Sequence, residues 1–273
     1  MKRKRVRVKE VAKITLLFIV LLVTIVAAID MGQRIWLPGE NHPKEETFLI
    51  TEKTDIIDAF AAKQGLSRKE WPQELVDLLE RNPDTEEFVL NYPSKKDLIY
   101  EIDLSDSLNG ETVPLFMQWD ERWGYTIYGS NVMGLTGCGP TCLSMVLVHL
   151  LQDVSLTPRY VADFAEENRY YVDGSGSKWS LISEGGEKLG LDITELPLDE
   201  NRIKKNLEIG NPVICIMGPG DFTTAGHYIV LIGVEDDKFV VNDPNSKTNS
   251  GRLWSYDEIK GQIKNLWACR VPE

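Results

Sequence analysis

The pattern of apolar and polar positions divides the chain into a first part with short helices and a second part in which helices are followed by strands. An almost continuous apolar run from Cys138 to about Leu151 predicts a helix buried on most sides. Further apolar runs predict four strands, at residues 212–217, 228–234, 239–242 and 266–271. Helices first and strands afterwards predict an α+β domain in which the helices pack on an antiparallel sheet.

Other helices are predicted from apolar residues at helical spacing. In chain order they cover residues 54–61, 75–81, 85–92 with an end before Pro93, 159–168 and 180–189. The first three lie before residue 110, where we find no grouping of side chains that suggests catalysis.

The N-terminus combines a basic head with an apolar segment. Residues 1–13 carry seven Lys or Arg and one Glu, and Ile14–Ile29 contains no charged residue. We expect a transmembrane signal anchor over residues 14–32, with the head in the cytoplasm and the rest of the chain outside. Cleavage after Val26-Ala27-Ala28 by signal peptidase, which would release a secreted protein, and a buried core helix are the alternatives.

A change in texture near residue 110 marks the expected domain boundary. Residues 33–110 begin with a stretch interrupted by Pro and Gly, and we interpret them as a linker and a small helical region that acts as a spacer or a brace. Trp, Gly and strand-like runs become more frequent beyond it, so residues 111–273 are expected to form the domain that carries the chemistry.

The charge balance excludes one class of partner. The 273 residues are 42% hydrophobic and 26% charged, as in an ordinary globular protein. The formal net charge is −12, and because the basic head contributes +6, the remaining residues contribute −18. An acidic body lacks the basic footprint that nucleic-acid binding needs, so we expect no nucleic-acid partner.

A cysteine at the start of the long apolar helix is the first candidate for chemistry. Cys138 lies in Gly137-Cys138-Gly139-Pro140, where unpaired N–H groups and the helix dipole favour a thiolate, the nucleophilic form. The other cysteines, at 142, 215 and 269, are interpreted as small core residues, although a Cys215–Cys269 disulfide stays open. Cys138 and Cys142 lack two further ligands at zinc-finger spacing, so we expect neither a metal nor a cofactor.

Three histidines are available as partners for the thiol. His42 lies in the linker, and His149 is eleven residues beyond Cys138 on the same helix, about 16 Å along its axis. His227 is left as the candidate base.

His227 begins a predicted hairpin whose second strand ends at Asp243-Pro244. Antiparallel pairing about a turn centred on Glu235 places His227 opposite Asp243, whose carboxylate can orient the ring towards Cys138. Asn242 is the alternative third member, on the opposite side of the strand. A Cys, a His and an Asp presented in this way are the parts of a cysteine hydrolase.

Over about residues 113–270, the chain resembles the papain-like cysteine peptidases. Within them it is most similar to the peptidase-39-like branch, relatives of the domains that cut double-glycine leaders from bacteriocin precursors. The resemblance rests on Gln118-Trp119-Asp120, Arg122-Trp123, Tyr128-Gly129, Gly137-Cys138-Gly139-Pro140-Thr141, Met145, Gly226-His227-Tyr228 and Asp243-Pro244. It implies a papain-like fold in which Cys138 is the nucleophile, His227 the general base and acid, and Asp243 the orienting residue.

The resemblance also implies an oxyanion hole, formed by the backbone N–H of Cys138 and a Gln side chain a few residues before it. The sixth residue before the cysteine is Val132, which cannot donate, so Gln118 becomes the candidate and Asn131 a weaker substitute. Leader peptidases are normally fused to an export ATPase, but the chain has neither a Gly-x-x-x-x-Gly-Lys-Ser/Thr loop nor a multispan region. We therefore expect no fused ATPase and do not transfer the double-glycine preference.

The expected function is a membrane-anchored, extracytoplasmic cysteine peptidase of a bacterium with a single envelope membrane, acting on peptide or protein substrates. One alternative keeps the fold but cleaves peptidoglycan, as an amidase or endopeptidase; the acidic body argues mildly against it, because wall polymers are largely anionic. The other is a catalytically silent module of the same fold that binds peptides, and the intact Cys, His and Asp argue against it.

Overall fold

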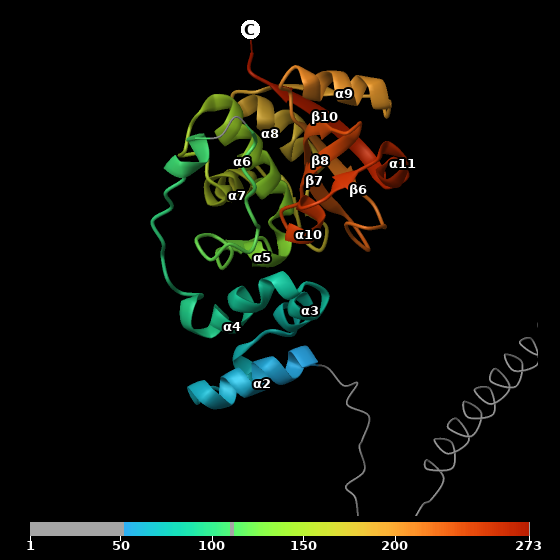
Figure 1. The fold of residues 1–273 in the computed structure, drawn as a ribbon. Helices are drawn as coiled ribbons and strands as arrows, with labels where there is room; N and C mark the ends of the chain where they lie inside the picture. The colour runs from blue at the N-terminus through green and yellow to red at the C-terminus, as the bar shows by residue number, and fades with distance from the viewer. Residues whose placement is uncertain (1–51, 110–111, 273) are drawn as a thin grey trace, which may run out of the picture. The chain divides into compact units, whose positions relative to one another are not determined.

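The computed structural model describes residues 52–109 and 112–272, which belong to one compact unit, Thr51–Glu273 (Figure 1). The basic head at 1–13 and the predicted membrane anchor at 14–32 lie outside the described residues. Within the described part of the chain, none of the helices is both long enough and apolar enough to cross a membrane.

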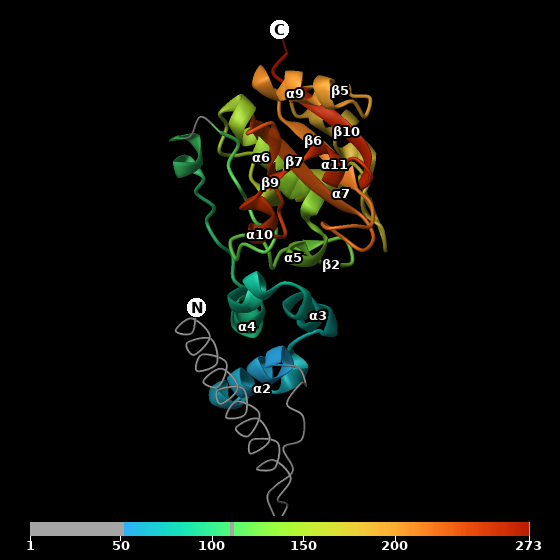
Figure 2. The same ribbon diagram turned by 45° about the vertical axis from the view of Figure 1, so that its right-hand side comes forward.

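A six-stranded antiparallel sheet forms the centre of this unit (Figures 1 and 2). Across the sheet the strands are β5 (Asp192–Glu195), β10 (Ile263–Arg270), β6 (Val213–Met217), β7 (His227–Glu235), β8 (Lys238–Asn242) and β9 (Leu253–Trp254). The four predicted strands correspond to β6, β7, β8 and β10, and the predicted α+β class is confirmed. The sequence pattern missed β5 and β9, which are the short strands at the two edges.

Helices cover both faces of the sheet. On one face lie α6 (Cys138–Leu151) and α7 (Pro158–Glu167), and on the other α9 (Glu200–Glu208) and α11 (Tyr256–Ile259). Successive side chains of a strand point to opposite faces, so β6 directs Ile214 towards α6 and Cys215 towards α9. All five residues of β6 are buried, which explains why its sequence is continuously apolar.

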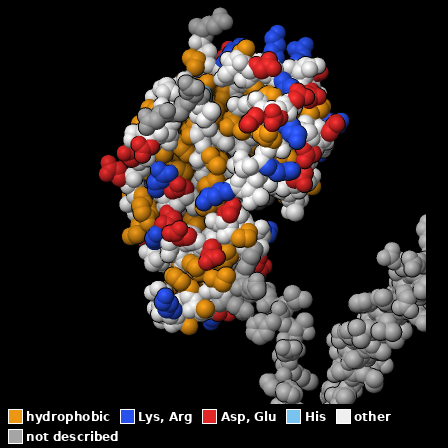
Figure 3. All heavy atoms as spheres, in the orientation of Figure 1, with side chains coloured by type: hydrophobic (Ala, Val, Ile, Leu, Met, Phe, Trp, Pro, Cys, Tyr) orange, Lys and Arg blue, Asp and Glu red, His pale blue; other side chains and the backbone are white. Residues whose placement is uncertain are grey.

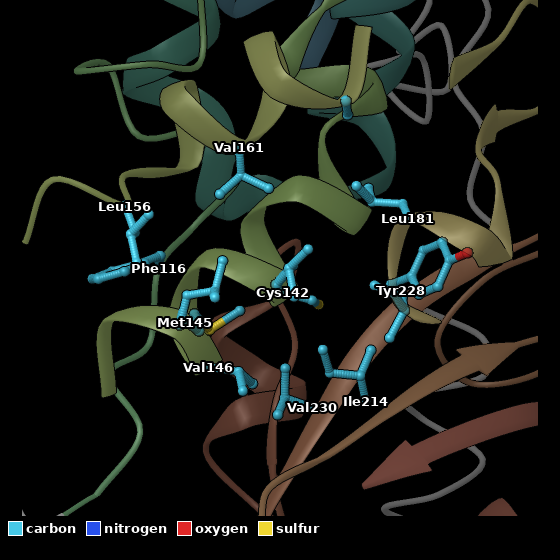
Figure 4. Close-up of a cluster of buried hydrophobic side chains, with 14 of the residues drawn as sticks. Phe116, Cys142, Met145, Val146, Leu156, Val161, Leu181, Ile214, Tyr228 and Val230 are labelled. Atoms are coloured by element: carbon cyan, nitrogen blue, oxygen red, sulfur yellow. The ribbon is translucent and has the colours of Figure 1, made fainter. Parts of the chain in front are cut away.

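The helix α6 has the bounds that the apolar run predicts, and its packing fixes the position of its first residue. Cys142, Met145 and Val146 are fully buried in a cluster with Ile214 and Val230 of the sheet (Figure 4). Protein cores pack as densely as organic crystals, so such contacts leave the helix little freedom to slide. The N-terminus of α6 is therefore held at a set place relative to β7.

The position of two cysteines on the sheet decides whether they can form the Cys215–Cys269 disulfide that the sequence left open. Cys269 lies in the cluster beneath α6, whereas Cys215 lies in the cluster on the opposite face, and both are free thiols. Because the sheet separates the two side chains, a Cys215–Cys269 disulfide is excluded.

Three helices precede the sheet and its covering helices in the chain: α2 (Glu52–Gln64), α3 (Gln73–Arg81) and α4 (Glu86–Lys95). The predicted end of the third helix before Pro93 is wrong, since α4 continues through this residue. A proline has no N–H for the carbonyl four residues before it, here that of Val89. The indole Nε1 of Trp71 donates to this carbonyl at 2.7 Å, so the helix loses no buried hydrogen bond.

Shorter elements connect these parts. They are β1 (Ile127–Tyr128), β2 (Asn131–Val132), α5 (Met133–Thr136), β3 (Tyr171–Val172), β4 (Gly176–Ser177), α8 (Ser183–Lys188) and α10 (Lys247–Ser250), with short 3-10 helices at Arg68–Glu70, Pro83–Thr85, Ser105–Asn109 and Trp179–Leu181. The predicted helix at 180–189 is thus divided between the last 3-10 turn and α8.

Candidate active site

The thiol of Cys138 stands at the first position of α6. The preceding Gly137 provides no side-chain cap, so the first N–H groups of the helix keep their capacity to bind an anion. At Gly139 a side chain is excluded, because a Cβ atom there would lie 2.6 Å from Oγ of Ser177. Cys138 is half-buried and opens into a cleft of about 690 Å³.

The imidazole of His227 lies at the same end of the sheet, at the first residue of β7. Its Nε2 donates to Oδ1 of Asp243 at 2.7 Å, and the ring lies close enough to the thiol of Cys138 for the two groups to shift each other's pKa. With Nε2 engaged, Nδ1 is the nitrogen left to face the sulfur. His149 lies in the last turn of α6, and His42 is outside the described residues.

The predicted register of the hairpin is wrong, although the predicted contact exists. The turn is Asp236-Asp237, with both residues at positive φ (49° and 62°), as a two-residue type I′ turn requires. Val230 pairs with Asn242, and the register shifts at residue 232, so a straight ladder would set Asp243 opposite residue 229. Asp243 reaches His227 because it lies just beyond the end of β8, where pairing no longer directs its side chain.

The carboxylate of Asp243 is almost completely buried, with 1% of its surface exposed, and both of its oxygens accept hydrogen bonds. Oδ1 also accepts from the backbone N–H of Asn245 at 2.8 Å, and Oδ2 accepts from Nδ2 of Asn249 at 2.8 Å. Asn249 of α10 was not predicted, because a polar residue six positions away in a surface turn carries no signal of this contact.

Asn242, the alternative third member, takes no part in these contacts. Its Nδ2 donates to the carbonyl oxygens of Val113 and Pro114, both at 3.1 Å. As predicted, it faces the other side of the strand, where it fixes the segment that leads into the domain.

The three side chains shift one another's pKa in a consistent direction. Burial would raise the pKa of Cys138, but the hydrogen bond and charge of His227 outweigh it and lower that pKa. Burial would lower the pKa of His227, but the charge and hydrogen bond of Asp243 raise it above the ordinary value. For Asp243, burial would raise the pKa and His227 holds it below the ordinary value. At a pH above the pKa of Cys138 and below that of His227, the favoured form is therefore a thiolate–imidazolium pair.

The structure places Gln118 in the same cleft, twenty residues before the cysteine in the chain. Its backbone N–H donates to the carbonyl of Pro244 at 2.7 Å, and its Nε2 donates to the carbonyl of Gly134 at 2.8 Å. No described residue accepts a second hydrogen bond from Nε2, and Oε1 is buried without a hydrogen-bond partner. Asn131 is the weaker substitute, and its Oδ1 accepts a hydrogen bond from the backbone N–H of Val132 at 2.9 Å.

Among the described residues, no group of three or more His, Cys, Asp or Glu is arranged to hold a metal ion. Cys142, one turn below the candidate nucleophile, is fully buried, and burial raises its pKa well above the ordinary value. It therefore behaves as a core residue rather than as a ligand or second nucleophile.

A cysteine at the start of a buried helix, facing a strand-borne histidine backed by a carboxylate, defines the class of papain-like cysteine peptidases. Residues 111–271 match the Peptidase_C39 like family, and the chain belongs to that family. No curated protein matches the chain.

Three solved structures are similar to parts of the chain. The peptidase domain of Streptococcus ComA, a bi-functional ABC transporter involved in a quorum sensing pathway, is 18% identical over 50% of this chain and 93% of that domain, with a TM-score of 0.39. A putative C39-like peptidase from Bacillus anthracis is 16% identical over 64% and 99%, with a TM-score of 0.40. A double glycine motif protease from an AMS/PCAT transporter, in complex with the leader peptide, is 20% identical over 59% and 92%, with a TM-score of 0.38.

Proposed function

We propose that this protein is a cysteine peptidase that hydrolyses peptide bonds, with Cys138 as nucleophile, His227 as general base and acid, and Asp243 as the residue that orients His227. The observation that carries the proposal is the chain of contacts from the half-buried thiol to the imidazole, both of which line an open cleft, and from the imidazole to the buried carboxylate. Membership of the Peptidase_C39 like family supports it.

The reaction proceeds in two halves. The Cys138 thiolate attacks the carbonyl carbon, and the oxyanion that forms accepts hydrogen bonds from the N–H of Cys138 and Nε2 of Gln118. The imidazolium of His227 gives its Nδ1 proton to the departing amine as the C–N bond breaks, which leaves a thioester. His227 then takes a proton from water, the hydroxide attacks the thioester, and the sulfur leaves as thiolate with release of a carboxylic acid.

The same proposal includes the location of the chemistry. Residues 14–32 anchor the protein in the cell membrane, and residues 33–110 join this anchor to residues 111–273, which act outside the cytoplasm. The basic head and the uncharged apolar run indicate this orientation. Protease added to intact protoplasts should degrade the C-terminal domain. A domain that stays protected until the membrane is lysed would contradict this location.

The reactivity of Cys138 tests the chemistry without a known substrate. The other three cysteines are fully buried with raised pKa values, so iodoacetamide should label Cys138 selectively in the native full-length protein. We expect a reaction that titrates well below about 8.5, the unperturbed value, and moves to higher pH in His227→Ala. His149→Ala is the matched control, because it removes a histidine from the far end of the same helix.

If Cys138 reacts with an ordinary pH dependence that does not change in His227→Ala, the peptidase proposal is wrong and a peptide-binding module is the better account. A reactive thiol with release of muropeptides from purified sacculi, and no cleavage of peptides, would redirect the proposal to peptidoglycan.

A further inference from the structure

One wall of the active-site cleft comes from helices that precede the family match. The match begins at residue 111, whereas Leu78, Arg81, Asn82 and Pro83 line the same cleft as the thiol and the imidazole. Figure 3 shows the surface hollowed between the region of α3 and the loops at the near end of the sheet. The N-terminal helices thus contribute surface that a substrate in the cleft must contact.

This wall is held against the rest of the unit by close packing. Phe88 of α4 occupies a slot over Gly134, where a Cβ atom would lie 2.5 Å from the ring. The same ring stacks on Tyr125, with centroids 4.5 Å apart. Buried residues of α3 and α4 share a hydrophobic cluster with Met117 and Trp119, which flank Gln118.

Polar contacts tie the wall to the segment that carries the carboxylate. Nδ2 of Asn82 donates to the carbonyl of Asn245, and the backbone N–H of Lys247 donates to Oδ2 of Asp84 at 3.2 Å. Asn245 and Lys247 follow Asp243 by only a few residues. The end of α3 therefore keeps a defined position relative to the reacting groups.

Arg81 brings a positive charge to this wall. It is exposed, and among the described residues it has neither an ion-pair nor a hydrogen-bond partner. The cleft's Asp221 is engaged by Gln262, which donates through Nε2 to Oδ2 at 2.6 Å and accepts from the N–H of Asp221 at 2.7 Å. Apart from His227, which acts in the reaction itself, Arg81 is the cationic side chain in the described lining of the cleft.

We propose that Arg81 forms a carboxylate-binding subsite, so that the peptidase selects peptides with an acidic side chain or a free C-terminal carboxylate on the side of the scissile bond that faces α3. The inference rests on the proposed function. A guanidinium offers a fork of donors that matches a carboxylate. The body of the protein is acidic and repels anionic peptides in general, so the guanidinium on this wall of the cleft favours those that place their carboxylate against it.

The test uses a positional library of N-acetylated octapeptides in which one position at a time is Glu or Gln and the others are mixed, each made as acid and as amide. Cleavage is measured with the full-length protein, and binding with full-length Cys138→Ala, by fluorescence anisotropy. Each measurement is repeated with Arg81→Gln and Arg81→Glu. Lys63→Gln is the matched control, because Lys63 also stands in the last turn of a helix but lies outside the cleft.

We expect a five- to tenfold preference, about that of one ordinary net hydrogen bond as suits an exposed guanidinium, for Glu over Gln at one position or for acid over amide. The preference should appear in KM and in binding, disappear in Arg81→Gln, and reverse in Arg81→Glu, while Lys63→Gln keeps it. A Glu preference assigns the site to a side chain, and an acid preference assigns it to the chain terminus.

Cleavage without any carboxylate preference, or with a preference that survives in Arg81→Gln, overturns the subsite and leaves the peptidase intact. Binding that depends on Arg81 without cleavage overturns the peptidase and keeps the subsite. Absence of both overturns both. A lower melting temperature in Arg81→Gln with unchanged selectivity would mean that Arg81 only complements the dipole of α3, which also overturns the subsite.

Discussion

Replacement of Asp243 by Asn tests the electrostatic argument most directly, because it removes one charge and keeps the shape of the side chain. The amide oxygen of Asp243→Asn can still accept from Nε2 of His227, which it now meets at 2.7 Å. Asn249 can rotate its amide and present its oxygen to the new NH₂ group, so the contact at 2.8 Å survives as well. The fold should therefore remain, and the change should act through charge.

The magnitude follows from the burial of the pair. An opposite charge in direct contact shifts a pKa by about 1 to 3, and each unit corresponds to about 1.36 kcal/mol. Without the carboxylate, the pKa of His227 falls. The pKa of Cys138 rises, because the imidazolium that lowers it is populated less.

The pH profile then narrows from both sides. Activity that needs the thiolate–imidazolium pair begins as pH rises through the pKa of Cys138 and ends as pH rises through that of His227. The first limb should move up and the second down in Asp243→Asn, and kcat/KM at neutral pH should fall at least tenfold. The assay is kcat/KM against pH for a cleaved library peptide, with iodoacetamide labelling of Cys138 in parallel.

Asp237→Asn is the control, since it removes the same charge from the turn of the same hairpin, where the side chain is 89% exposed and Asn tolerates the positive φ. Its profile should match that of the unmodified protein. If the pH profile of Asp243→Asn also matches that of the unmodified protein, the charge of the buried carboxylate does not set the ionisation of Cys138 and His227.

Three further substitutions probe other parts of the structure. Gln118→Ala should lower kcat by about 10²–10³ with little change in KM, because it removes an oxyanion donor. A rise in KM of the same size with kcat unchanged would mean that Gln118 contributes to ground-state binding instead. Gly139→Ala should destabilise the fold by about 1–3 kcal/mol in urea unfolding, since the new Cβ would meet Ser177 at 2.6 Å; unchanged stability would show that this contact relaxes freely. Trp71→Phe should cost about 1 kcal/mol by leaving the carbonyl of Val89 without its donor, and a value near zero would mean that water replaces the indole.

Much of the fold was predictable because its signals are local. A strand buried on both faces must be apolar throughout, and β6 shows that pattern in its own residues. The helix α6 is apolar for the same reason, and the position of Cys138 at its start follows from the Gly-Pro sequence around it. The choice of His227 needed only elimination, since helix geometry keeps His149 away from the thiol.

Other parts were not predictable, because they depend on contacts between distant segments. The end of α4 was misplaced since the carbonyl of Val89, which Pro93 leaves without a helical donor, is satisfied by the indole of Trp71, eighteen residues before Val89. The register of the hairpin was misjudged because the turn lies between Asp236 and Asp237 rather than on Glu235, and the polar run around it does not mark which two residues take positive φ.

The sequence by itself determined which residues carry reactive groups and which elements present them, because thiol, imidazole and apolar periodicity are properties of short stretches. Only the tertiary structure decided that Asn249 donates to the carboxylate, that Gln118 lies in the cleft, and that the end of α3 forms one wall of it. Each of these depends on bonds such as that from Asn82 to Asn245, across 163 positions of the chain. Such a contact exists only once the core has packed, and nothing in either stretch alone specifies the other.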